Sequence, residues 1–263
     1  MAPGTRPAAA GEKPGGSAEG DAEPARRSAS EAAIARHPHL AEELPPGHVR
    51  VDCHLHTMWS GDSTTTPEEL AAAVNDSAID VLCITDHGTI KGALRLSGEL
   101  DCRVVIGQEQ RTPDGEVIGL FISERIPSGC RSAREAAGHI RAQGGLVYVP
   151  HPYDPLRHRL HSDVLEQLAA DGLLDVIETR NAKTSLEHLN AQAADTAARL
   201  GLAAGAGSDA HVPDALGAAY VEMEWFEGAA GFLEAVRRGR VVGHHFDRAR
   251  PWRGRIVPST AGH

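Results

Sequence analysis

From Val49 onward, short runs of β-branched and apolar residues alternate with helical segments. Alternation of this kind is typical of βα units, in which helices connect the strands of a parallel sheet or barrel. Nine apolar runs are predicted to be strands, at residues 49–53, 79–85, 103–106, 117–122, 146–149, 175–178, 202–206, 218–223 and 241–244. The pattern therefore predicts one barrel-like α/β domain.

Helical segments are predicted between these runs, and several carry clear end signals. Thr66 can cap the first helix, Pro67 fits its first turn, and Glu69 stands three residues after the cap. Later helices are expected to stop at Gly144 and Gly201, because glycine readily adopts the left-handed conformation found after a helix.

The first 47 residues differ from the rest of the chain. They are rich in Ala, Gly, Pro, Glu and Ser and contain no aromatic residue, so they have little apolar area with which to offset the entropy of ordering. We expect residues 1–47 to be a disordered extension, with at most a short helix over residues 30–44. The α/β domain is assigned to residues 48–247, and residues 248–263 are expected to be a loose tail.

Composition narrows the function and the compartment. A chain of 263 residues with 41% hydrophobic residues is long enough for one large core, whereas a net charge of −10 and 4% aromatic residues argue against a nucleic-acid partner. Four cysteines without CxxC spacing are typical of a reduced protein. With no apparent signal peptide or membrane span, we expect a cytoplasmic protein, and its oligomeric state stays open.

The first candidate metal ligands lie at the end of the first predicted strand. His54 and His56 are two residues apart at the end of the run 49–53, and Asp52 has the same parity. Side chains two apart on a strand point to the same face, so the two imidazoles are expected to lie side by side. Paired imidazoles are common metal ligands, although such a pair also arises in ordinary packing.

Other ionisable residues follow the predicted strands in the same way. Seven side chains occupy such positions: His54, His56, His87, Glu109, His151, Asp209 and His211. In a parallel barrel these positions converge on one rim, where active sites are built. A mixed nitrogen and oxygen set suits Zn, Mn or Fe, and its size indicates two or three ions. Such centres split phosphate esters with a metal-activated water.

Five motifs then resemble, in order, those of the PHP (polymerase and histidinol phosphatase) superfamily. They are residues 52–57, 85–87, 107–109, 150–152 and 207–211. The resemblance implies a distorted, TIM-like β/α barrel of seven strands, a trinuclear metal centre and phosphoesterase activity. It also implies a small phosphorylated substrate.

The resemblance further implies a ligand set grouped by ion: His54, His56, Glu109 and Asp209 at the first, Asp62, His87 and His211 at the second, and Glu109 with His151 at the third. Many relatives have another histidine before the His151 motif, where this chain has Glu116. We interpret Glu116 as a carboxylate substitute in the third position, against the alternative of a solvated glutamate.

Catalytic roles are expected for Glu109, His211 and Asp86. Asp86 could orient His87, or it could serve only to stabilise a turn. Four cations are predicted on the same rim: Arg111, Arg157, Arg180 and Lys183. Of these, Arg157 and Arg180 are favoured as phosphate contacts, together with Asn181.

Three alternatives remain open. The same chemistry could serve an exonuclease on single-stranded nucleic acid, or the domain could bind metal for regulation without catalysis, with the N-terminal extension as a docking arm. An amidohydrolase acting on C–N bonds is a third alternative. That class often uses a bridging lysine on a middle strand, and residues 117–122 contain none.

Overall fold

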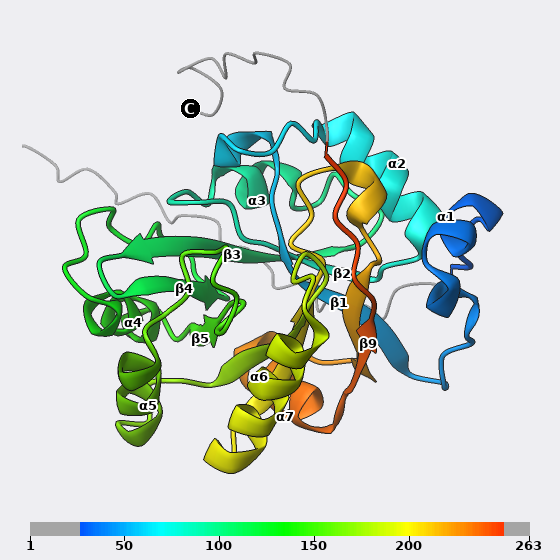
Figure 1. Cartoon of the computed structure of the whole chain (residues 1–263). Coiled ribbons are helices and arrows are strands. Elements are labelled where there is room, and N and C mark those ends of the chain that lie inside the picture. The colour runs from blue at the N-terminus through cyan, green and yellow to red at the C-terminus, as the bar shows by residue number, and fades with distance from the viewer. Residues whose placement is uncertain (1–26, 250–263) are drawn as a thin grey trace, which may run out of the picture.

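The computed structural model describes residues 27–249. Its strands are β1 (His48–Leu55), β2 (Val81–Ile84), β3 (Arg103–Thr112), β4 (Gly115–Leu120), β5 (Leu146–Val149), β6 (Val176–Asn181), β7 (Ala203–Gly207), β8 (Ala219–Glu224) and β9 (Arg240–Gly243). They form one sheet in the order β7-β6-β5-β4-β3-β2-β1-β8-β9, and β3, β4 and β5 lie together in Figure 1. The α/β barrel-type fold predicted from the sequence is confirmed.

Two groups of parallel strands carry the functional side of the sheet. β1, β2 and β3 are mutually parallel, as are β5, β6 and β7, and the antiparallel strand β4 joins the two groups. The barrel is nearly closed where the end of β7 meets β1, because the Asp209 N–H donates to the His54 carbonyl at 2.7 Å and Leu55 bridges Ala210. The ends of β1 and β7 are thereby held together.

The strand count differs from the seven that the resemblance implies. Strands β8 and β9 add antiparallel to the edge beside β1, with Val51 opposite Val221, and extend the sheet to nine strands within residues 27–249. The expected strand over 103–106 is also longer, because β4 pairs with its continuation from Gly107 to Thr112. Glu109 consequently lies within β3 rather than after its end.

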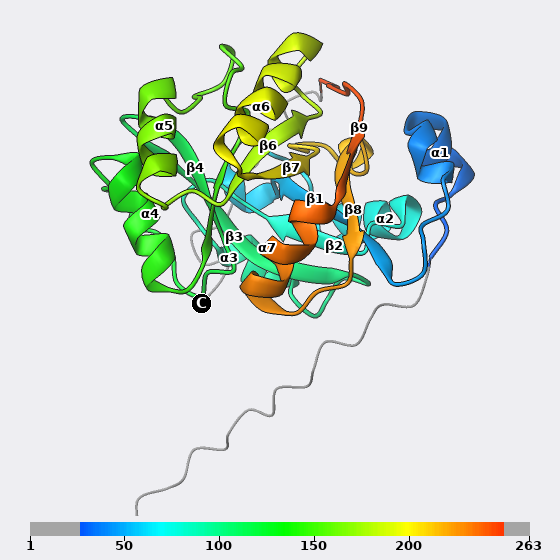
Figure 2. The same cartoon turned by 90° about the horizontal axis from the view of Figure 1, so that it is seen from below.

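Seven α-helices surround the sheet in the part of the chain described: α1 (Glu31–Arg36), α2 (Pro67–Ser77), α3 (Lys91–Leu96), α4 (Ala133–Ala142), α5 (Ser162–Ala170), α6 (Glu187–Leu200) and α7 (Gly228–Arg238). Figure 2 shows α4 and α5 beside β4, with α1 and α2 at the opposite end of the molecule. The start of α2 is as predicted, since the Glu69 N–H donates to the Thr66 hydroxyl and the Thr66 N–H donates to the Glu69 carboxylate. No helix within residues 27–249 is both long and apolar enough to cross a bilayer.

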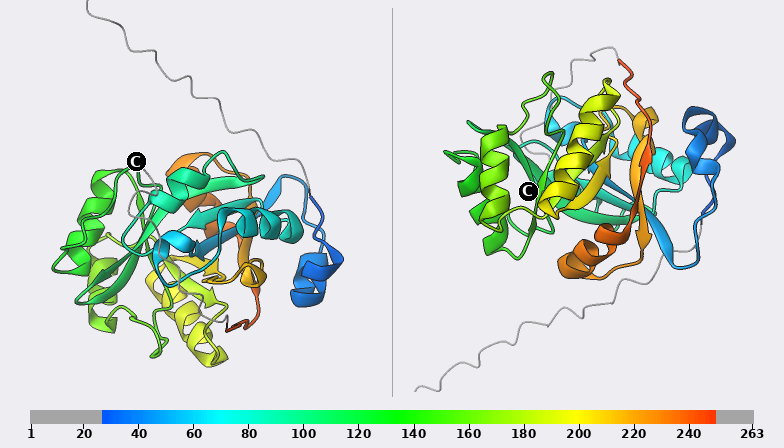
Figure 3. Two further views of the ribbon diagram at one scale, coloured as in Figure 1. Left: turned by 90° about the horizontal axis from the view of Figure 1, so that it is seen from above. Right: turned by 60° about the horizontal axis from the view of Figure 1, so that its bottom comes forward.

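Residues 27–47, which the sequence assigns to a disordered extension, are instead packed on the domain. Helix α1 lies beside α2 in both views of Figure 3, and the Ser30 N–H donates to the Asp76 carbonyl at 2.8 Å. Ala33 and Leu40 are buried in the same apolar cluster as Val74. The same cluster contains Leu70 of α2, so the segment before β1 shares a buried apolar contact with that helix. Residues 1–26 and the tail from residue 250 lie outside the described residues.

Apolar side chains fill the barrel interior beneath the polar rim and form one buried cluster. Val51, Cys53 and Cys83 contribute to this cluster, and α7 adds Phe232. Tyr148 is also fully buried there, but its hydroxyl donates to the Glu178 carboxylate at 3.0 Å. Because Glu178 belongs to the polar rim, this hydrogen bond joins the core to the candidate site.

Candidate metal centre

The two histidines of β1 point into the barrel rim, as their spacing predicts. His54 is fully buried, and its Nδ1 lies 3.1 Å from a carboxylate oxygen of Glu178, which can only accept. The Nδ1 of His56 lies 2.9 Å from the Ser60 hydroxyl. With Nδ1 of His54 carrying the proton, its Nε2 lone pair faces the Nε2 of His56 at 3.0 Å. In this tautomer the Nε2 lone pair of His54 is available to a metal ion beside His56.

Glu109 occupies the middle of the cluster. Its Oε2 lies 3.4 Å from Nε2 of His54, 3.2 Å from Nε2 of His56 and 3.3 Å from Nδ1 of His87. Its Oε1 lies 3.3 Å from Nε2 of His151. One buried carboxylate therefore faces different imidazoles with its two oxygens, which is the arrangement expected of a bridging ligand.

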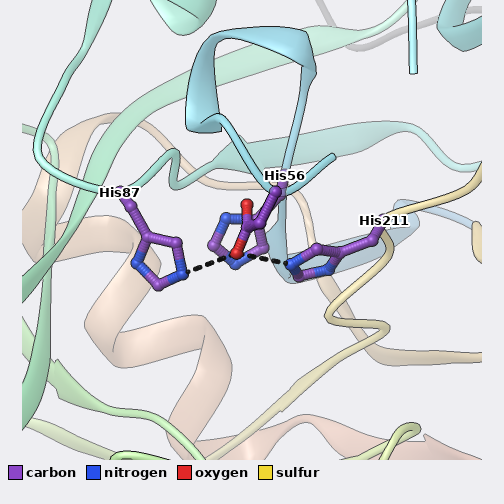
Figure 4. Close-up of side chains that lie close together, drawn as sticks. His56, His87 and His211 are labelled. Atoms are coloured by element: carbon purple, nitrogen blue, oxygen red, sulfur yellow. Dashed lines mark ion pairs between the residues drawn. The ribbon is translucent and has the colours of Figure 1, made fainter. Parts of the chain in front are cut away.

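Asp62, His87 and His211 form the exposed side of the cluster. Asp62 Oδ2 lies 3.2 Å from Nε2 of His87 and 3.2 Å from Nε2 of His211, and His56, His87 and His211 point toward one another in Figure 4. The Asp62 side chain is 47% exposed, whereas Glu109 is buried. Solvent and ligands therefore reach the cluster from this side.

Glu116 lies at the third side of the cluster, where the sequence analysis expects it. Its Oε1 is 3.9 Å from Nδ1 of His87, and its Oε2 is 3.9 Å from Nε2 of His151. The Arg111 guanidinium donates two hydrogen bonds to Oε1, at 3.0 and 2.8 Å. Glu116 is thus a buried carboxylate beside Glu109 rather than a solvated one.

All nine expected ligands are brought together in the structure. Their donor atoms fall into four groups whose members lie within 4.8 Å of one another: His56, Asp62, His87 and His211; His54, Glu109 and His151; His54, His56 and Asp209; and His87, Glu109 and Glu116. Each group mixes imidazole nitrogen with carboxylate oxygen, which is a donor set typical of Zn, Mn or Fe.

Buried donor atoms without partners provide a direct test of the fit to metal. Nδ1 of His87, Oε1 of Glu109 and Nδ1 of His151 are buried and have no hydrogen-bond partner. Buried polar atoms in folded proteins are rarely left unsatisfied, because each costs about 1–3 kcal/mol. At His87 and Glu109 these atoms face other donor atoms of the cluster, so divalent ions would satisfy them.

Charge in the cluster favours cations. Burial would lower the pKa of His54, but the carboxylates of Glu178 and Asp209 raise it well above its ordinary value. Burial would raise the pKa of Glu109, but the nearby imidazoles of His54 and His151 hold it well below its usual range. Glu109 therefore stays ionised in the buried part of the cluster, where its negative charge attracts cations.

Two of the nine residues have a strained backbone. His151 and Asp209 have φ angles of 30° and 49°, in a region that residues other than glycine rarely adopt. The His151 N–H donates to Glu178 at 2.8 Å, and the Asp209 N–H donates to the His54 carbonyl at 2.7 Å. Strain held by surrounding hydrogen bonds in this way is typical of functional sites.

Glu178 is the main residue that the sequence analysis missed. It is fully buried at the inner face of β6 and contacts the Nδ1 of His54, the His151 N–H, the Tyr148 hydroxyl and the Asn181 amide. It touches two expected ligands without belonging to any ligand group. A carboxylate on an apolar strand was the available signal, since such residues are seldom buried without a partner.

Replacing Glu178 with Gln is expected to lower metal affinity about 10- to 100-fold, because histidine ligands depend on the group that orients them. Affinity can be measured by titration against a competing chelator. Tyr148→Phe is the matched control, since it removes another hydrogen bond to Glu178 and leaves the contact with His54 intact. Equal affinity of E178Q and the unchanged protein would show that Glu178 does not orient His54.

The remaining predicted site residues do not all face the cluster. Asp86 accepts from the Thr57 N–H at 2.6 Å and from the Thr57 hydroxyl at 2.7 Å, so it positions the loop after β1 and contacts no donor atom of the nine. The expected catalytic role of Asp86 is therefore replaced by a positioning role. Asn181 is buried and donates to Glu178 at 2.9 Å and to Asp209 at 3.3 Å. It therefore supports the cluster from its buried side and does not face solvent, where a substrate would approach.

The two favoured arginines are also differently placed from the expectation. Arg180 donates two hydrogen bonds of 2.6 Å to Glu187 on α6. Arg157 lies in the loop after β5, its Nε is buried without a partner, and within residues 27–249 it makes no ion pair with the cluster. Lys183, which was not favoured, contacts the exposed side of the cluster, at 3.1 Å from Nδ1 of His211.

Comparison with known proteins points to the same family. The model of the PHP domain matches residues 52–110, and the model described as PHP-associated matches residues 187–241. An uncharacterized protein of Methanocaldococcus jannaschii is 38% identical, over 48% of this chain and 80% of its own length. The error-prone DNA polymerase of Mycobacterium bovis is 35% identical, but over 36% of this chain and only 11% of the polymerase.

A solved structure agrees in fold. A two-domain protein of Bacteroides vulgatus that contains a predicted PHP-like metal-dependent phosphoesterase superposes with a TM-score of 0.62. The two are 18% identical, and the match covers 77% of this chain and 68% of that one. At this identity the similarity establishes the barrel fold alone.

Proposed function

Because the chain belongs to the PHP superfamily, we propose that it is a metal-dependent phosphoesterase that hydrolyses a small phosphate ester. The observation that carries the proposal is the convergence of nine imidazole and carboxylate side chains in one cluster, which is exposed at Asp62. The described cysteines are free, which supports a reducing compartment, and we place the protein in the cytoplasm.

The nine side chains would hold two or three ions of Zn, Mn or Fe. His54, His56, Glu109 and Asp209 would serve the innermost position, and Asp62, His87 and His211 the exposed one. Bound divalent ions supply Lewis acidity and a water of lowered pKa. Glu116 and His151 would complete a third position beside Glu109, in which a carboxylate would take the place of the histidine that the family resemblance implies.

The residues of the site have separate roles in holding the ions and the substrate. Glu109 keeps the positions at a fixed separation, because its two oxygens face different imidazoles. His211 lies on the exposed side, where it would contact both the metal and the incoming phosphate ester. The buried side, formed by His54 and Glu178, excludes water and fixes the direction of the ligands.

A second candidate is an exonuclease on single-stranded nucleic acid, because a DNA polymerase matches residues of this chain. The net charge of −10 and the low aromatic content argue against it. A non-catalytic metal-binding domain is a weaker candidate, since the exposed side of the cluster gives a ligand access.

The test is a panel of phosphomonoesters, phosphodiesters and single-stranded oligonucleotides, assayed with protein loaded with Mn, Zn or Fe. We expect turnover of a small ester that chelation abolishes and that His54→Ala reduces to background. His188→Ala is the control, because His188 lies on α6 and belongs to no ligand group. A metal-loaded protein that turns over no ester would contradict the proposal, and release of mononucleotides would favour the exonuclease.

A further inference from the structure

One cation lies directly beside the expected metal ligands. The Lys183 ammonium is 3.1 Å from Nδ1 of His211 and 3.9 Å from Oδ1 of Asp209. Its side chain is 11% exposed, and it is next to the exposed side of the cluster that His211 and Asp62 line. A positive charge in this place can reach a ligand that approaches the cluster from solvent.

The hydrogen bonds of His211 show what this ammonium can bind. Nδ1 of His211 lies 2.9 Å from the Asp209 carbonyl oxygen, which only accepts, as well as 3.1 Å from the Lys183 ammonium, which only donates. The ring nitrogen can serve one of them at a time. If Nε2 of His211 coordinates a metal, the neutral ring carries its proton on Nδ1 and donates to the Asp209 carbonyl. Lys183 then has no acceptor on His211, and its protons are available to an anion.

The turn that carries Lys183 is held in place from two sides. The Lys183 N–H donates to the Asn181 side chain at 2.9 Å, and Asn181 in turn contacts Asp209. The Ala182 carbonyl accepts from the Phe246 N–H at 2.8 Å. A preorganised backbone lowers the entropic cost of binding through this lysine.

Two of the other three rim cations are paired with carboxylates. Arg111 is paired with Glu116, and Arg180 makes two short hydrogen bonds to Glu187. Neither guanidinium has an ion pair with Asp209 within residues 27–249. The third, Arg157, has a buried Nε without a partner, but it also has no ion pair with the cluster in the described part of the chain. Lys183 is therefore the rim cation in contact with His211, on the exposed side of the cluster.

We propose that Lys183 binds a non-bridging oxygen of the phosphoryl group at the metal cluster, and that it does so in place of the two arginines favoured by the sequence. The inference rests on the proposed function, and it makes Lys183 a determinant of selectivity for phosphate dianions. The rival role for Lys183 is a fixed countercharge to Asp209 that only stabilises the cluster.

Inorganic phosphate is the probe that separates the two roles. Its dissociation constant is measured by calorimetry on Mn-loaded protein, after metal content has been determined for each variant. We expect Lys183→Met to keep the metal content of the unchanged protein and to weaken phosphate binding about 10- to 100-fold, as for loss of a charge-assisted hydrogen bond. Lys183→Arg should retain most of the affinity. Arg180→Met is the matched control and should bind phosphate normally.

Phosphate binding by K183M that equals that of the unchanged protein would overturn the inference, as would an equal loss in R180M. A K183M protein with fewer bound ions would also overturn it, because Lys183 would then support the metal centre. Since phosphate binding is measured without turnover, the inference can fail while ester hydrolysis is found. It can equally hold when no ester in the panel is hydrolysed.

Discussion

Replacing Glu109 with Gln is expected to lower kcat/KM at least about 1,000-fold and to remove at least one bound ion. Glu109 faces His54, His56, His87 and His151 at 3.2–3.4 Å, so its charge is shared by several ligand positions. A neutral amide cannot bridge two cations, and loss of a metal position removes several kcal/mol of transition-state stabilisation, at about 1.4 kcal/mol for each tenfold in rate. Metal content and kcat/KM should be measured on the same preparation.

Glu166→Gln is the control for Glu109→Gln. Glu166 is an exposed carboxylate on α5 that pairs with Arg199 on α6, so its neutralisation should change neither metal content nor activity. If E109Q retained all its ions and more than a tenth of the activity, Glu109 would not be the bridge that the geometry indicates.

Metal loading is expected to stabilise the protein strongly. An ion that binds only the folded state at 1,000 times its dissociation constant adds about 4 kcal/mol to the free energy of unfolding. For a domain of this size, that corresponds to a rise in Tm of about 8–16 °C. The origin is the satisfaction of buried donors such as Nδ1 of His87 and Oε1 of Glu109. Thermal melts of chelator-treated protein, with and without added Mn, measure the effect.

The stabilisation must depend on the cluster. His54→Ala should abolish most of the rise in Tm on adding Mn, whereas His188→Ala on α6 should leave it unchanged. A similar rise in the His54→Ala protein would place the stabilising ion somewhere else in the molecule.

The fold could be predicted from the sequence because its local signals agree. Apolar runs, the Thr66 cap and the helix stop at Gly201 all specify the same alternation of strands and helices. The hairpin of β3 and β4 was less accessible, because the continuation of β3 through Gln108 and Glu109 is polar and does not show the apolar pattern of a strand, although it pairs with β4. Likewise, the packing of α1 depends on contacts of Ala33 that no local pattern announces.

The candidate site was likewise only partly predictable from the sequence. Seven of the nine expected metal ligands occupy motifs, and their strand positions predicted their convergence. The supporting residues depend on side-chain geometry that the sequence does not display. Glu178 has no motif of its own and is defined only by its contact with His54. Lys183 and Arg180 are both cations near the end of β6, and only their contacts, with His211 and Glu187, distinguish them.

The most direct test of the metal centre is the metal content of the full chain purified without chelator, followed by anomalous diffraction from its crystals. We expect two or three transition-metal ions per chain, each within about 2.0–2.3 Å of the nitrogen or oxygen atoms of residues among the nine. Protein without bound metal even after incubation with Mn, Zn and Fe, or ions located away from His54, Glu109 and Asp209, would contradict the account.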